Sequence, residues 1–208
     1  ANRDSELPLS FAQERLWFLD QLTPNSPAYN IPLAVNVRGP VDMAVLQRCF
    51  QEIVRRHEVL RTTFATLDGH PRLVIAPTLA NPFTTLDLTS LPEPERQEQL
   101  RQLVSSEAAR GFDLARGPLL RVALLRLADD DSVLMLTMHH VVSDEWSLGV
   151  LVRELAVLYE AFCLGRDSPL EKLPIQYVDF ARWQREWLQG AVLQSQLAYW
   201  KDQLARLS

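Results

Sequence analysis

Cysteine is scarce in this sequence: only Cys49 and Cys163 occur in 208 residues. Both fall on the apolar stripe of an expected helix, where a thiol packs as a small hydrophobic side chain. We therefore expect two buried thiols and no disulfide framework, as is usual in a reducing compartment. The first residues, Ala1 to Asp4, do not resemble a secretory signal. The expected location is the cytoplasm.

Long apolar runs and basic clusters are missing as well. Although 47% of the residues are hydrophobic, no stretch approaches the roughly 20 apolar residues that a membrane-spanning helix needs. Acidic residues number 26 and basic residues 21, so the formal net charge is −5. This balance lacks the basic stripe of a nucleic-acid-binding protein, and it is repelled by an anionic membrane. We expect neither nucleic acid nor membrane as a partner.

The sequence instead alternates helix and strand patterns. The clearest helix is capped by Asp42 and carries an apolar stripe from Val45 to Val54. A continuously apolar segment, 133–136, is typical of a strand that is covered on both faces. Further helices are expected at about 10–22, 92–109, 146–164, 175–188 and 191–206. Further strands are expected at 31–37, from after Glu58 through Phe64, at 73–75 and at 119–127, and residues 77–91 are expected to form a loop. Together they predict a single α+β unit with a mixed sheet covered by helices.

Two adjacent histidines, His139 and His140, end the apolar strand. Neighbouring strand residues point to opposite faces, so one imidazole should be buried and the other should face a cleft. Asp144 follows four residues later, directly before an expected helix, where a carboxylate can cap the helix or pair with a cation. A purely structural interpretation, with two satisfied core histidines and a capping acid, stays open. A metal site would need further ligands such as His57 or His70, and neither has ligand spacing.

Four segments of the sequence resemble the N-terminal half of a nonribosomal peptide synthetase condensation domain, which has a chloramphenicol acetyltransferase-like αβ sandwich fold. They occur in the family's order over residues 9–183. They are Leu9-Ser10-Phe11-Ala12-Gln13-Glu14-Arg15-Leu16-Trp17-Phe18-Leu19, Arg56-His57-Glu58-Val59-Leu60-Arg61-Thr62-Thr63-Phe64, Met138-His139-His140-Val141-Val142-Ser143-Asp144-Glu145-Trp146-Ser147 and Tyr177-Val178-Asp179-Phe180-Ala181-Arg182-Trp183.

The resemblance implies amide formation between two carrier-bound substrates. A donor acyl or peptidyl thioester and an acceptor aminoacyl thioester arrive on the phosphopantetheine arms of upstream and downstream carrier proteins, and the domain itself binds no cofactor. His140 is implied as the catalytic residue, either as a general base or as a hydrogen-bonding group that positions the amine. His139 and Asp144 are implied to support its loop, and we infer that Asp144 pairs with Arg61. Glu145 departs from the family's usual glycine and puts a charge beside the acceptor route.

The resemblance also implies that residues 1–208 are the first lobe of a two-lobe domain. We then expect the isolated chain to be inactive and to self-associate weakly, because the surface that meets the second lobe and the neighbouring adenylation domain is uncovered. Three alternatives have a related fold: an epimerisation domain, a CoA-dependent acyltransferase and a non-catalytic recruitment module. Trp146-Ser147 favours a condensation domain over the first, and the intact His pair argues against the third. The heterocyclisation variant, which has Asp in place of the His pair, is excluded.

Overall fold

A four-stranded mixed sheet is the centre of the computed structural model, which describes residues 6–79 and 82–205. Its strand order is β1-β6-β5-β4. Strands β1 (Asn30–Arg38), β6 (Asp131–His139) and β5 (Leu120–Arg126) are antiparallel neighbours, and β4 (Phe83–Asp87) runs parallel to β5 at the edge. A separate antiparallel hairpin consists of β2 (Thr62–Leu67) and β3 (His70–Ile75).

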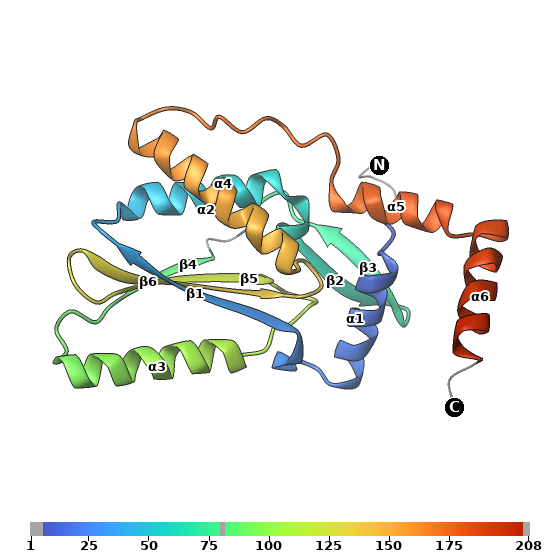
Figure 1. Ribbon diagram of the computed structural model, residues 1–208, viewed down its shortest axis with the longest axis horizontal. Helices are drawn as coiled ribbons and strands as arrows, with labels where there is room; N and C mark the ends of the chain where they lie inside the picture. The colour runs from blue at the N-terminus through green and yellow to red at the C-terminus, as the bar shows by residue number, and fades with distance from the viewer. Residues whose placement is uncertain (1–5, 80–81, 206–208) are drawn as a thin grey trace.

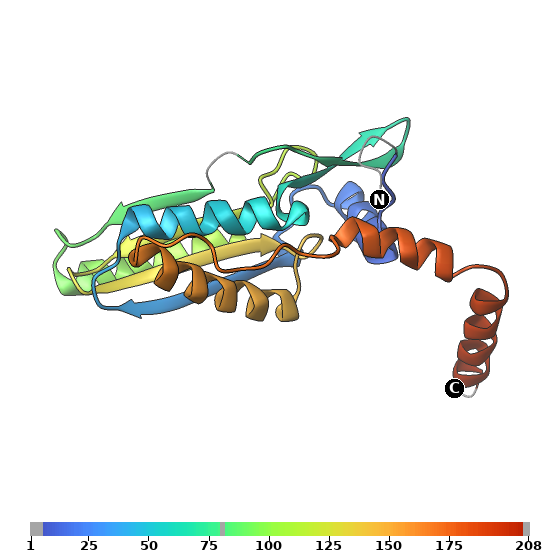
Figure 2. The same cartoon turned by 90° about the horizontal axis from the view of Figure 1, so that it is seen from above.

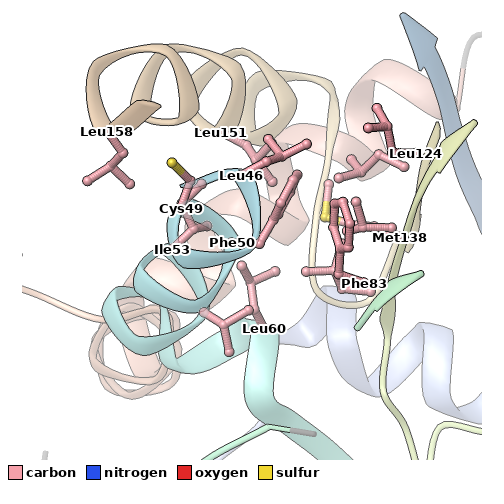
Figure 3. Packing of buried hydrophobic residues seen from close by; sticks show 14 of the residues in the cluster. Leu46, Cys49, Phe50, Ile53, Leu60, Phe83, Leu124, Met138, Leu151 and Leu158 are labelled. Carbon is pink, nitrogen blue, oxygen red and sulfur yellow. The ribbon is translucent and has the colours of Figure 1, made fainter. Parts of the chain in front are cut away.

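Helices cover both faces of the four-stranded sheet (Figure 1). Helices α2 (Met43–Arg56) and α4 (Glu145–Cys163) pack side by side on one face, and α3 (Glu93–Ala109) packs on the other. Figure 3 shows the resulting core, in which Phe50 of α2 lies toward Met138 of β6 and Phe83 of β4. On the opposite face, Val133 and Met135 pack with the apolar side of α3. The prediction that the 133–136 strand is covered on both faces is therefore confirmed.

The remaining helices gather at one end of the sheet (Figure 2). Helix α1 (Phe11–Leu22) and α5 (Tyr177–Trp187) lie beside the β2-β3 hairpin, and a long connection after α4 runs back along the molecule to reach α5. Helix α6 (Gly190–Leu204) projects away from the body. Within the described residues, no helix combines the length and apolar character that crossing a bilayer requires.

Most elements lie where the sequence predicts them, because caps and periodicity mark their ends. Ser10 and Asp42 both cap their helices by accepting from backbone N–H groups, as expected. Two expectations were wrong. The segment 77–91 contains β4, a short edge strand whose threonines give it the polar composition of a loop. Cys163 is exposed at the C-terminal end of α4, whereas Cys49 is buried as predicted.

Candidate active site

The loop with the His pair joins β6 to α4 and is anchored in two different hydrophobic clusters. Met138, before the pair, belongs to the cluster between the sheet and α2 and α4. Val141 and Val142, after it, belong to a second cluster with Leu16, Trp17 and other side chains. The His140 backbone N–H donates to Tyr29 O at 2.9 Å, and Val142 N–H donates to His139 O at 3.0 Å. Packing on both sides therefore fixes where the two imidazoles lie.

His140 is exposed and has one ring nitrogen engaged by its own loop. Its Nδ1 lies 2.8 Å from Ser143 O, and since a carbonyl can only accept, Nδ1 carries the proton. In the neutral ring Nε2 is then the unprotonated nitrogen, and His140 lines a cleft. An imidazole held in this tautomer can accept a proton or a hydrogen bond from a bound group.

His139 is buried, with 3% of its surface exposed. Its Nδ1 accepts from Val141 N–H at 3.1 Å, and its ring lies near the rings of Tyr29 and Phe112. Burial, and secondarily the neighbouring His140, lowers the pKa of His139 to about 4. A neutral His139 thus supports the turn from inside. The predicted division, with one histidine inward and one toward a cleft, is confirmed.

We expect His139 to remain neutral on acidification until about pH 4. Because its folded-state pKa lies below the ordinary value of 6.5, the unfolded chain takes up the proton first. The free energy of unfolding should therefore fall as the pH drops from about 6.5 toward 4. Imidazole 15N NMR over this range would measure the titration of His139 directly. A His139 midpoint near 6.5 would contradict the burial argument.

Asp144 caps α4 and does not pair with Arg61, so that prediction was wrong. Its carboxylate accepts from Ser147 N–H at 2.8 Å and Ser147 Oγ–H at 2.5 Å, and these hydrogen bonds lower the pKa of Asp144. Arg61 donates to Ala76 O and lies 3.8 Å from Glu58 Oε1. Arg61 therefore has other partners. The negative charge of Asp144 instead interacts favourably with the N-terminal end of α4.

Glu145 is the first residue of α4 and is exposed. The residues that line the cleft include its neighbours Asp144 and Trp146, but Glu145 is not among them in the described part of the chain. The carboxylate therefore lies outside the cleft lining, at the first turn of α4, where the positive end of the helix dipole favours it.

The cleft has a volume of about 860 Å³ and is mostly apolar. Side chains from α1, α2, α4 and α5 and from the His loop form its walls, including Leu16, Ile53, Leu151 and Phe180. Trp146, 83% exposed, stands beside it. Its charged or ionisable lining groups are Arg15, Asp144, Tyr29, Tyr177 and the two imidazoles of His57 and His140. A cleft of this size can hold a small organic substrate, with a few polar groups to orient it.

Three buried or half-buried polar residues of the site were missed by the sequence analysis. Gln13 of α1 donates its Nε2 to Val141 O at 3.4 Å, so α1 supports the His loop. Glu154 of α4 accepts from His57 at 2.8 Å and from Arg56 at 3.3 Å. Gln176, before α5, bonds the backbone on both sides of His57. The sequence did contain an indication of Glu154. A charged residue three positions after Leu151 and four before Leu158 lies on the apolar stripe of the helix.

His57 and His70, the histidines considered as additional metal ligands, are separated in the structure. His57 is paired with Glu154, and His70 is exposed at the start of β3. Over residues 6–79 and 82–205, no three His, Cys, Asp or Glu side chains lie together in a way that could hold a metal ion.

Comparison with known proteins gives a consistent result. The family model described as "Condensation domain" matches residues 3–208. A linear gramicidin synthase from Brevibacillus parabrevis is 50% identical over 202 residues, which are 97% of this chain and 3% of that protein. The starter condensation domain of rhizomide synthetase RzmA superposes with a TM-score of 0.85 at 26% identity, covering 98% of this chain and 49% of that one.

A further structural match is the X-domain in its complex with OxyB from teicoplanin biosynthesis. Its TM-score is 0.86 at 28% identity, and the match covers 100% of this chain and 45% of that chain. The chain therefore spans about half the length of these solved structures and a small part of the gramicidin synthase. The mixed sheet covered by helices is the chloramphenicol acetyltransferase-like fold that the sequence predicted. By sequence and by fold, the chain belongs to the condensation domain family.

Proposed function

We propose that this chain is the His-bearing half of a condensation domain that forms amide bonds in nonribosomal peptide synthesis. Its substrates would be a donor acyl or peptidyl thioester and an acceptor aminoacyl thioester, carried on phosphopantetheine arms by an upstream and a downstream carrier protein. One observation carries the proposal. His140 lines a cleft of about 860 Å³ with Nδ1–H committed to Ser143 O, so that Nε2 is available to an incoming amine.

The chemistry follows from that tautomer. The acceptor amine attacks the thioester carbonyl, a C–N bond forms, the C–S bond breaks, and the donor's thiol leaves. Nε2 of His140 takes the proton that the amine loses and passes it to the leaving sulfur, or it holds the amine in the attacking position by accepting its hydrogen bond while the proton reaches the sulfur through solvent. An α-ammonium has an ordinary pKa of about 7.7–8.0 and imidazole one of about 6.5, so the proton transfer is only mildly uphill. Positioning the two reactants adds to the rate.

The other motif residues support this role from outside the reaction. His139 and Asp144 hold the two ends of the loop, by a buried hydrogen bond and by the cap of α4. Arg61 instead contacts Ala76 and Glu58, which belong to another part of the chain. Glu145, between two lining residues in the sequence, adds a negative charge that would favour an ammonium on the acceptor side.

A non-catalytic recruitment role is the second candidate, favoured by the likeness to the X-domain, which was solved in complex with OxyB. An oriented, exposed imidazole is not needed for recruitment, whereas amide formation uses it. The test is an assay of the intact domain with both carriers loaded. An amide product on the downstream carrier, detected by mass spectrometry, supports condensation. A stable complex with a partner protein and no product supports recruitment. An inverted donor stereocentre, or turnover of a free acyl-CoA alone, points to the epimerisation or acyltransferase alternative.

A second lobe is part of the proposal, since the chain spans about half the length of the solved structures that it matches. The end of the molecule formed by α5 and α6 carries large exposed aromatic side chains, which a partner surface would cover. They include Trp183 at 53%, Trp187 at 47% and Trp200 at 55% exposure. The cleft lies against α5, so a second lobe docked at this end would complete its walls.

We accordingly expect residues 1–208 alone to form no amide and to self-associate. Apolar area left in contact with water favours association in proportion to the area that becomes buried. Light scattering or sedimentation velocity over a range of concentrations should show a rising average mass. Replacing both Trp183 and Trp200 with Gln should reduce it, because these side chains are exposed and their loss leaves the buried core intact. A clean monomer at millimolar concentration would contradict this prediction.

A further inference from the structure

The cleft contains a second imidazole, His57, that the role proposed for His140 does not use. His57 directly follows α2 and lines the cleft. Its Nε2 lies 2.8 Å from Glu154 Oε2, and because a carboxylate accepts, Nε2 carries the proton. Its Nδ1 has no hydrogen bond to the described residues. Nδ1 is also not one of the buried nitrogen and oxygen atoms that lack a partner among those residues. Nδ1 is therefore a solvent-accessible nitrogen without a hydrogen bond, in a side chain that lines the cleft.

Hydrogen bonds fix His57 from several directions. Gln176 donates to Arg56 O at 2.8 Å and accepts from Glu58 N–H at 3.0 Å, so it holds the backbone on both sides of the imidazole. The His57 N–H donates to Ile53 O at 3.0 Å. With the ring held by Glu154, both ends of the residue are immobilised. Such support is what a side chain needs in order to present one atom to a ligand.

Burial of the carboxylate that orients His57 costs desolvation free energy. Glu154 is 8% exposed, and its other partner, Arg56, is also 8% exposed. A buried ion pair gives little net stability relative to apolar side chains of similar size, because desolvation offsets the attraction. The neighbours of Glu154 on the same helix face, Leu151 and Leu158, show that apolar side chains fit there. Stability alone therefore does not account for Glu154, whereas orientation of His57 does.

We propose that His57 is a substrate-contacting residue, whose Nδ1 accepts a hydrogen bond from an amine or amide N–H of a bound thioester substrate. The inference rests on the proposed function, since it assumes that substrates occupy this cleft. With Nε2–H committed to Glu154, a neutral His57 offers the cleft an acceptor and no donor. A substrate N–H that enters a mostly apolar cleft loses its hydrogen bonds to water and needs such an acceptor. The N–H belongs either to the acceptor amine or to an amide of the donor.

The test is His57→Gln in the intact condensation domain with loaded carriers. The glutamine amide reaches the position of Nε2 and can still donate to Glu154, but it leaves no acceptor at the position of Nδ1. We expect an unfolding midpoint close to that of the wild type and a drop in kcat/KM of about 3- to 10-fold, the loss of one hydrogen bond. Varying the donor and the acceptor separately identifies the source, because kcat/KM drops for the substrate that carries the N–H. The matched control is His70→Gln, since His70 is exposed on β3 and is not part of the cleft lining.

A second variant keeps the proposal testable if His57→Gln is unstable. The asparagine of His57→Asn can place an amide oxygen near the position of Nδ1 but cannot reach Glu154. This variant should therefore retain more activity than His57→Gln, and its unfolding midpoint should lie at a lower denaturant concentration. Unchanged kcat/KM for both substrates in His57→Gln overturns the proposal, as does a larger loss in His57→Asn at a temperature where both variants are folded. Neither result bears on the proposed function, which fails if the wild type forms no amide.

Discussion

Replacing His140 with alanine in the intact domain should lower kcat for amide formation by about 100- to 10,000-fold, the range expected when a general base is lost. The variant removes the Nε2 atom that faces the cleft and the Nδ1–H bond to Ser143 O. Fold stability should change little, because the ring is exposed and the loop is anchored by Val141 and Val142. Single-turnover assays with both carriers loaded would measure the step directly.

A second substitution separates the two contributions of His140. In His140→Asn the side-chain amide can still donate to Ser143 O, so the loop keeps its hydrogen bond, but nothing remains at the position of Nε2. If His140→Asn is as slow as His140→Ala, Nε2 performs the chemistry. If His140→Asn retains most of the activity, the histidine acts through the shape of its loop. Wild-type turnover in His140→Ala would overturn the catalytic role of His140, whereas a wild type that forms no amide would leave the recruitment role.

Local signals in the sequence were sufficient for most of the fold. The helix that follows Asp42 has a cap, an apolar stripe and a defined end, so its prediction needed no knowledge of the rest of the chain. Strand β4 had no such signal. Its partner β5 lies more than 30 residues later in the sequence, and at the sheet edge only Phe83 of its five residues is buried. A short parallel edge strand is defined by its neighbour, which a sequence pattern does not reveal.

The candidate site divides in the same way. Strand alternation was sufficient to predict that His139 and His140 serve different purposes, because it depends on backbone geometry alone. The partner of Asp144 depends on tertiary structure, and the pairing with Arg61 that the motif suggested was wrong. The carboxylate of Asp144 accepts hydrogen bonds from Ser147, in the first turn of α4, and not from Arg61. Glu154 was overlooked because the leucines around it gave the stripe an apolar pattern. A lone acid on such a stripe indicates a buried partner, here Arg56 and His57.

Glu154→Ala should lower the free energy of unfolding by about 3–5 kcal/mol, as removal of one partner from a buried ion pair does. The change leaves the Arg56 guanidinium buried without a counter-charge, and Arg56 is already short of partners because its Nε is a buried unpaired atom. It also removes the acceptor of His57 Nε2–H. Urea unfolding of the variant and the wild type at pH 7 would give the difference. Glu160→Ala is the matched control, since Glu160 is exposed on the same helix, and it should stay within about 0.5 kcal/mol.

The pH dependence gives this prediction a second measurement. Burial acts to raise the pKa of Glu154, but the hydrogen bonds from His57 and Arg56 and the charge of Arg56 outweigh it, so the pKa is lowered from the ordinary 4.5. The contribution of Glu154 is then fully present above about pH 4.5 and is lost as the pH falls through the lower folded-state value. Glu154→Ala should therefore flatten the acid side of the stability profile, where wild type and variant converge. A constant difference between them down to pH 3 would mean that packing, and not the charge of Glu154, stabilises the contact between α2 and α4.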